Sequence, residues 1–179
     1  MRLFAAIGIP ADIQEWLLAL PGGLPGADWV DAETAHVTLR FIGEVGRGHA
    51  EEIDTALAEI SAPGFEMALA GIDFFQTAGR PRVLWAGVEA PAELAYLARK
   101  IDRTVVETGL PSEDRSFTPH VTVARLRDAS LPQVMRFVTG HALFRTPPFA
   151  VDRFTLFESR QGKGGPAYFP LADYPLPRR

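Results

Sequence analysis

The sequence contains no cysteine, no long apolar run and no excess of positive charge. Without cysteine, disulfides, thiolate metal sites and cysteine nucleophiles are excluded together, and this composition suits a reducing cytosol. The opening MRLFAAIGIPADIQEW is too short and too polar for a secretory signal, because Pro10, Asp12 and Glu15 interrupt it. No segment approaches the roughly 20 apolar residues of a membrane helix. We therefore expect a cytoplasmic protein without a membrane partner.

The overall charge limits the kind of nucleic-acid binding that this chain can perform. Its formal net charge is −4, whereas coating a long nucleic acid requires many side chains that neutralise phosphates. A local pocket for one terminal phosphate is compatible with this charge. The chain has 179 residues, of which 47% are hydrophobic, so it is large enough to bury a core as one folded domain.

The hydrophobic pattern repeats one order of elements: helix, strand, helix, strand, strand. A buried strand over 2–9 comes before both copies and has no counterpart in the repeat. The first copy is predicted as a helix over 11–20, a strand at HVTLRF (36–41), a helix over 49–60 and strands over 65–75 and 82–89. The second is predicted as a helix over 91–106, a strand at HVTVAR (120–125), a helix over 131–138 and strands over 149–159 and 168–174.

The two copies share a register. His36 and His120 are 84 positions apart, and so are Phe65 and Phe149, which begin corresponding strands. We interpret residues 1–179 as a single domain of two interleaved lobes, with an internal repeat of about 11–88 and 91–172. The predicted fold is α+β and bilobal, with two pseudo-symmetric lobes. Each lobe is expected to be a largely antiparallel sheet with helices on its outer face, and a cleft should lie between them.

The repeated His-Val-Thr motif has a geometry that suits a phosphate. Alternate side chains of a strand share one face, so His36 and Thr38 point one way and Val37, Leu39 and Phe41 point to the core. His120 and Thr122 follow the same rule. Residues two apart in a strand are about 6.7 Å apart, so both side chains can reach one tetrahedral group. Two such strands predict a phosphate site with one histidine on each side for proton transfer.

Two simpler explanations of these histidines compete with a phosphate site. Both could be structural groups that only satisfy hydrogen bonds, but the matched residues and register argue against coincidence. A zinc site would need a third ligand, and no carboxylate stands at a recognisable spacing. His49 and His141 belong to no comparable pattern, and we predict that they are surface residues.

At HVTLRFIGEV and SFTPHVTVAR the chain resembles the two-histidine phosphoesterase superfamily. Within it, the resemblance is to bacterial and archaeal RNA 2′,3′-cyclic phosphodiesterases, once described as 2′-5′ RNA ligases. The segments RLFAAIGIP, RPRVLWAGV, FTLFES and YFPLADYPL support it and extend it over nearly the whole chain. It implies a bilobal α+β fold with a central cleft and no metal or organic cofactor. The implied reaction is metal-independent hydrolysis of a 2′,3′-cyclic phosphate to a 2′-phosphate.

The resemblance also implies roles for individual residues. His36 would donate a proton and His120 would accept one, although the sequence alone allows the reverse. Thr38 and Thr122 would donate hydrogen bonds to non-bridging phosphate oxygens. Arg125 would bind the phosphate or the terminal nucleotide. Because strict alternation turns Arg125 away from His120, this role requires the strand to end or bulge there.

Other substrate-binding candidates follow from position and residue type. Alternation places Arg40 on the His36 face, where it would be a charge near the cleft. Four aromatic residues could stack on a base, although such residues more often belong to a core: Phe4, Phe41, Trp85 and Phe117. The glycine-rich SRQGKGGP (159–166) lacks the Walker spacing, and we expect a hairpin loop at the cleft rim.

Three functions from different classes remain open at this point. The first is a phosphodiesterase whose partners are RNA ends, or alternatively small nucleotides, with a 2′,3′-cyclic phosphate. The second is a non-catalytic module that binds a nucleotide in the same pocket. The third is a metal hydrolase, which EDTA would inactivate and zinc would restore. We expect the protein to be a monomer.

Overall fold

The computed structural model describes residues 1–178, and this part of the chain forms four α-helices, a 3₁₀ helix and one nine-stranded sheet. The helices are α1 (Ala11–Leu18), α2 (Arg47–Ala58), α3 (Ala92–Glu107) and α4 (Leu131–Gly140), with the 3₁₀ helix η1 (Ala32–Thr34). The strands are β1 (Arg2–Gly8), β2 (Ala27–Trp29), β3 (His36–Glu44), β4 (Phe65–Thr77), β5 (Arg80–Glu89), β6 (His120–Leu126), β7 (Phe149–Val151), β8 (Arg153–Gly162) and β9 (Gly165–Pro175). The α+β class is confirmed, with antiparallel pairing throughout.

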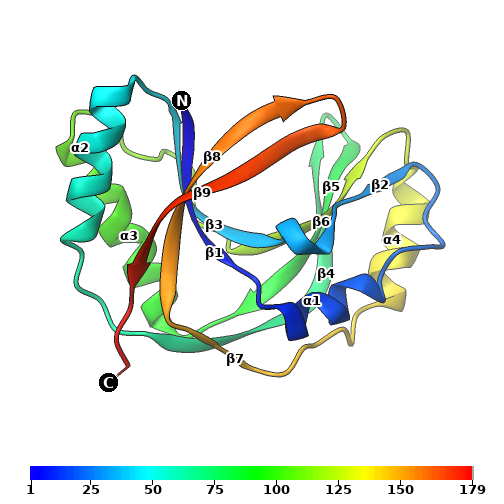
Figure 1. Cartoon of the computed structure of the whole chain (residues 1–179). Helices are drawn as coiled ribbons and strands as arrows, with labels where there is room; N and C mark the ends of the chain where they lie inside the picture. Colours follow the sequence, from blue (N-terminus) through cyan, green and yellow to red (C-terminus); the bar gives the residue numbers. More distant parts are fainter. Residues whose placement is uncertain (179) are drawn as a thin grey trace.

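The sheet is continuous across the two halves of the molecule (Figure 1). Its strand order is β7-β4-β5-β6-β3-β1-β8-β9, and β2 pairs with β6 outside this path. The motif strands β3 and β6 meet at the centre, where Val37 pairs with Val121. The expected two lobes are therefore two halves of one curled sheet, joined at the valines of the two motifs.

The hairpins of the two predicted copies lie on the side of the opposite motif strand. The β4–β5 hairpin of the first copy adds to β6, whereas the β8–β9 hairpin of the second copy joins β1 beside β3. β1 lies next to β3 as β5 lies next to β6, so the first strand does have a spatial counterpart. Sequence order concealed this relation because β1 and β5 come from different places in the repeat.

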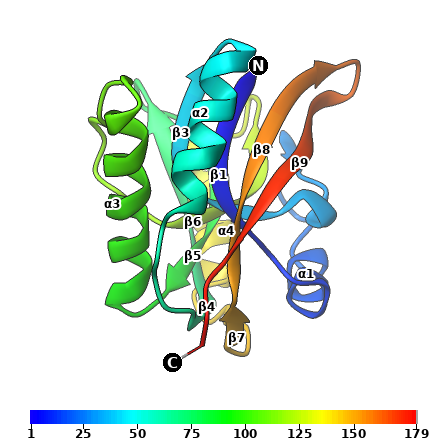
Figure 2. The ribbon, with the colours of Figure 1, turned by 60° about the vertical axis from the view of Figure 1, so that its left-hand side comes forward.

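The helices cover the outside of the sheet. Figures 1 and 2 show α2 and α3 on one side of the molecule and α1 and α4 on the other. In α3, buried Leu94, Leu97, Ile101 and Val105 recur at the three- and four-residue spacing of one helix face. Ser130 caps the start of α4, and its hydroxyl accepts a hydrogen bond from the Gln133 amide. The helices thus leave the opposite surface of the sheet available for a site.

Two details differ from the predicted elements. The strand expected over 149–159 is divided at Asp152, because β7 pairs with β4 and β8 pairs with β1. The elements β2 and η1 were not predicted, since each has only three residues and no period can be detected over that length. Within residues 1–178, no helix has the length and apolar character needed to cross a membrane.

Both motif strands contain a bulge directly after the threonine. In β3, Ala6 lies opposite Thr38 and Ala5 opposite Arg40, so Leu39 is the extra residue. In β6, Trp85 lies opposite Thr122 and Leu84 opposite Ala124, so Val123 is the extra residue. A bulge reverses the alternation of the residues that follow it. The same irregularity therefore occurs at matched positions of the two copies.

Candidate active site

A cleft of about 790 Å³ lies between the two halves of the sheet and contains both motifs. β3 contributes His36 and Thr38 to its lining, and β6 contributes His120 and Thr122. The valines between these residues are fully buried on the other face. Pleat geometry thus brings together the four residues that the sequence placed at one site.

Both imidazoles are oriented by the same local hydrogen bond. Nδ1 of His36 lies 2.8 Å from the carbonyl oxygen of Thr34, and Nδ1 of His120 lies 2.7 Å from that of Thr118. A carbonyl oxygen only accepts, so Nδ1 must carry the proton in each ring. Nε2 is then the nitrogen that is left for proton exchange with a molecule in the cleft.

Aromatic rings fix the position of each histidine. The ring of His36 lies 5.1 Å from Phe4 and 5.2 Å from Tyr168, between ring centres. The ring of His120 lies 5.0 Å from Phe75 and 5.7 Å from Trp85. These contacts limit the rotation of both imidazole rings. A proton-transfer site requires such a fixed orientation.

The pKa of His36 is lower than that of a free histidine. Burial is the main cause, because it disfavours the charged imidazolium. The hydrogen bond to the Thr34 carbonyl opposes this effect, while a positive charge on nearby His120 lowers the pKa further. In the free protein His36 is therefore mainly neutral at pH 7.

The bulge in β6 turns Arg125 into the cleft, which is the condition that its expected role required. The matching bulge in β3 does the same for Phe41, five residues after His36. Phe41 is 59% exposed, so the prediction that it belongs to the core was wrong. Alternation failed there because Leu39 adds one residue to the strand.

The same bulge removes Arg40 from the cleft, contrary to the prediction that it shares the His36 face. Arg40 is only 7% exposed and lies against α3, where its Nε is 2.7 Å from a carboxylate oxygen of Asp102. This is an ion pair without hydrogen-bond alignment. The guanidinium also donates to the carbonyls of Phe41 and Pro111, and it lies 3.7 Å from Glu113. Arg40 thus ties β3 to the loop that leads to β6.

The remaining aromatic candidates have different surroundings. Phe4 lines the cleft but is only 3% exposed, since it stacks on Phe157 with ring centres 5.2 Å apart. Phe117 is 37% exposed in the loop before β6 and does not line the cleft. Trp85 packs under His120 and is likewise absent from the lining. None of these three offers an open ring face to the cleft.

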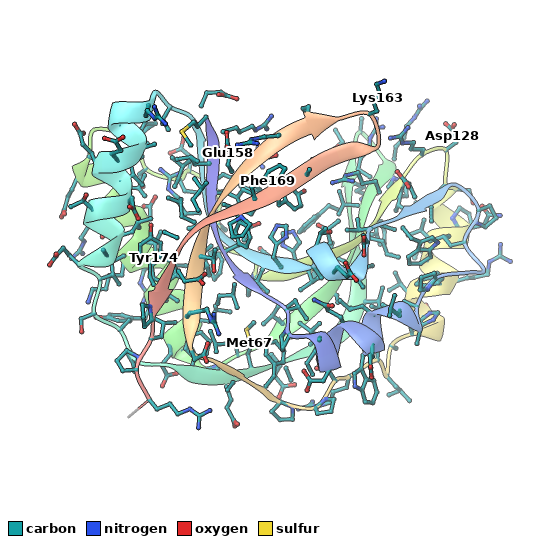
Figure 3. The ribbon with its side chains drawn as sticks, viewed as in Figure 1. Met67, Asp128, Glu158, Lys163, Phe169 and Tyr174 are labelled. Atoms are coloured by element: carbon teal, nitrogen blue, oxygen red, sulfur yellow. The ribbon has the colours of Figure 1, made fainter. Side chains whose placement is uncertain are left out.

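Several lining residues were not identified from the sequence. They are Arg2, Arg82, Arg115 and Arg127, with Tyr168 on β9. No linear motif marks them, because strand pairing and loop paths bring them together. The expected hairpin at 159–166 does reach the cleft, which Ser159, Gln161 and Pro166 line. Figure 3 shows Lys163 at the tip of this hairpin.

The other two histidines lie elsewhere and are half-buried rather than fully at the surface. Nε2 of His49 lies 2.9 Å from the Thr108 carbonyl at the end of α3, and His141 stacks on Phe137 with ring centres 4.0 Å apart. Over residues 1–178, no group of three or more His, Cys, Asp or Glu side chains is arranged to hold a metal ion.

Two His-Val-Thr strands that line one cleft are typical of the two-histidine phosphoesterases, and comparison with known proteins identifies the family. The sequence model of the 2′-5′ RNA ligase superfamily matches residues 9–163. The chain therefore belongs to this superfamily.

Named relatives extend the comparison over nearly the full chain. An RNA 2′,3′-cyclic phosphodiesterase of Archaeoglobus fulgidus is 32% identical over 171 residues, which cover 94% of this chain and 96% of the relative. One from Escherichia coli K12 is 32% identical over 191 residues, covering 98% and 96%. The crystal structure of E. coli LigT complexed with 3′-AMP has a TM-score of 0.77 and 31% identity, covering 98% of this chain and 97% of the other. A crystal structure from Thermus thermophilus has a TM-score of 0.81 and 26% identity, covering 99% of both chains.

Proposed function

We propose that this protein hydrolyses 2′,3′-cyclic phosphate termini of RNA to 2′-phosphates by metal-independent acid–base catalysis. The observation that carries the proposal is that two histidines from opposite halves line one cleft, each with Nδ1 bonded to a carbonyl and Nε2 left for chemistry. The names of the curated relatives support the same activity.

Opening the cyclic phosphate requires one proton to be removed and another to be supplied. A water oxygen attacks phosphorus while Nε2 of His120 takes its proton. The bond from phosphorus to the ribose 3′-oxygen breaks, and protonated Nε2 of His36 gives its proton to that oxygen. The products are a 2′-phosphate and a 3′-hydroxyl. Each histidine ends in the other protonation state, and exchange with solvent restores both.

The threonines act on the charge that develops on the phosphate. Thr38 and Thr122 line the cleft two residues after the histidines, and we infer that their hydroxyls donate to the two non-bridging oxygens. Arg125, turned inward by its bulge, supplies a permanent positive charge for the same phosphate.

The family resemblance assigns the role of proton donor to His36, and the burial of this residue supports the assignment. Burial lowers the pKa of His36, so a proton bound there is held weakly and is readily given to the leaving oxygen. An incoming phosphate anion favours that protonated state. The phosphate anion thus opposes the effect of burial on the pKa of His36.

The decisive experiment is hydrolysis of a short RNA ending in a 2′,3′-cyclic phosphate, in EDTA, with identification of the phosphorylated oxygen. We expect rapid formation of 2′-phosphate, lost in His36→Ala and in His120→Ala. His49→Ala is the matched control, since His49 lies outside the cleft. A 3′-phosphate product would contradict the regiochemistry. Activity that EDTA abolishes and zinc restores would favour a metal hydrolase, and nucleotide binding without turnover would favour a binding module.

A further inference from the structure

The cleft has a strongly asymmetric lining. Four arginines surround its β6 side, in β5, in β6 or in the loops that flank β6: Arg82, Arg115, Arg125 and Arg127. Within residues 1–178, the other half contributes one arginine to the lining, Arg2, and its walls beside His36 are aromatic. Over the same residues, Glu113 is the one carboxylate in the lining. In a chain with a formal net charge of −4, this concentration of positive charge indicates an anionic ligand.

Arg82 reaches the cleft through a bulge of its own. In the pairing of β4 with β5, Phe75 lies opposite Val83 and Gln76 opposite Pro81, so Arg82 is the extra residue. Val83 pairs with Arg125 and also lines the cleft. A regular strand would turn Arg82 away from Val83, whereas the bulge places both on the cleft. Arg82 thereby becomes a neighbour of Arg125.

These arginines are weakly compensated by acidic residues. Among the described residues, Arg82, Arg115 and Arg125 form no ion pair. Arg127 has only Asp28 at 3.8 Å, between two exposed side chains. A pair of this kind contributes little and is readily replaced by a better anion. The lone carboxylate, Glu113, is directed to Arg40.

The arginines also extend beyond the reach of one phosphate. Arg125 follows His120 by five residues, one of which is the bulged Val123, so its long side chain can reach back toward the phosphate. Arg127 lies two residues further on, roughly 20 Å from His120 along the strand. A cyclic phosphate held between the two histidines therefore cannot contact all of these groups. The charges beyond Arg125 are positioned for other phosphates of the same ligand.

We propose that Arg82 and Arg127 bind internucleotide phosphates upstream of the cyclic end, so that the preferred substrate is an oligoribonucleotide and not a small cyclic nucleotide. This inference rests on the proposed function, and it gives the bound RNA a defined orientation in the cleft. The terminal nucleoside lies toward the aromatic walls near His36, and the chain leaves the cleft past β5 and β6. Arginine suits this role because its fork of donors matches phosphate oxygens.

The test compares substrates of increasing length. Hydrolysis of a 2′,3′-cyclic mononucleotide is measured beside that of cyclic-ended RNAs of two to six nucleotides. The variants are Arg82→Gln, Arg127→Gln and the double variant. Arg80→Gln is the control for Arg82, since it removes the same charge from the same strand outside the lining. Asp28→Asn is the control for Arg127, since it removes the ion pair and keeps the arginine.

We expect kcat/KM of the wild type to rise with length and then level off. Each arginine variant should lose about tenfold on the longer RNAs and no more than about twofold on the mononucleotide. The slope of log kcat/KM against log salt should fall by about 0.7 for each phosphate contact removed. Both control variants should match the wild type. Equal kcat/KM at all lengths, or equal losses on the mononucleotide and the RNAs, would overturn the inference.

A binding measurement separates this inference from the proposed reaction. RNAs of one to six nucleotides carrying a 2′-phosphate are titrated against each variant by fluorescence anisotropy. Affinity that rises with length and is lost in the double variant would support the arginine subsites even if the wild type hydrolysed nothing. Affinity independent of length, in a wild type that hydrolyses cyclic ends, would overturn only the subsites.

Discussion

The strands β3 and β6 have the same backbone and different chemistry. Each begins with His-Val-Thr, bulges after the threonine and turns the fifth residue after its histidine into the cleft. That residue is Phe41 in β3 and Arg125 in β6. The residue before it is buried in both strands, but it is Arg40 in β3 and Ala124 in β6. The two strands thus keep the histidines and threonines at matching positions, while the positions that follow differ.

For the proposed function, this difference gives two similar motif strands a way to bind an asymmetric ligand. A cyclic phosphate has two oxygens with different fates and a nucleoside on one side only. An aromatic wall at His36 and a cationic wall at His120 give the cleft a matching direction. Substitutions can test this asymmetry, beginning with the groups that the two strands share.

The largest effect is expected from removing the shared groups. His36→Ala and His120→Ala should each lower kcat by about 10²- to 10⁴-fold, because each removes one proton-transfer step. The double variant should lose less than the product of the two, since the histidines act as a unit. Single-turnover kinetics measures these losses. Additive losses would show that the histidines work independently.

The second effect concerns stability and belongs to β3 alone. Arg40→Met should lower the free energy of unfolding by about 3–5 kcal/mol, because it leaves partly buried Asp102 without its partner. Urea unfolding measures this loss. Asp102 also accepts hydrogen bonds from Ser112 and the Glu113 amide, so the loop before His120 should loosen too. Ala124→Ser, at the matching position in β6, should lower the free energy of unfolding by less. An equal loss in both variants would contradict the proposed difference between β3 and β6.

The third effect compares the two residues turned inward by the bulges. Arg125→Gln should lower kcat/KM by about 10- to 100-fold, since it removes a charge-assisted hydrogen bond to phosphate. Phe41→Leu keeps an apolar side chain that still packs on a base, so it should lower kcat/KM by less than about tenfold, a part of the roughly 1–3 kcal/mol that base–aromatic stacking contributes. Steady-state kinetics on one cyclic-ended RNA gives both values. The reverse order would assign the phosphate to the His36 side.

The smallest expected effect is a pH dependence of the free energy of unfolding. NMR titration of the free protein should place the pKa of His36 below 6.5, because burial disfavours its charged form. The unfolded chain then binds a proton more readily than the folded one. Stability should therefore fall as pH decreases from about 7 through 6.5 toward the folded-state pKa. His36→Gln should lose less stability over this interval in urea titrations at each pH. A pKa of 6.5 or above would contradict the burial argument.

The sequence predicted the fold class and the core of the site because both depend on local periodicity. His36, Thr38, His120 and Thr122 share the cleft since each pair lies two residues apart, before any irregularity of its strand. Predictions failed beyond that point. Arg40 and Phe41 exchanged faces, and no period in the sequence reveals a bulge that only strand pairing creates.

By itself the sequence determined which motif residues line one cleft, because motif spacing along a strand fixes the side chains that share a face. Tertiary structure decided the rest. Strand pairing joined both predicted copies in one continuous sheet, and pairing between distant strands placed Arg82, Arg127 and Tyr168 around the same cleft. Such contacts depend on register between segments far apart in the chain, and a single sequence contains no local signal for that register.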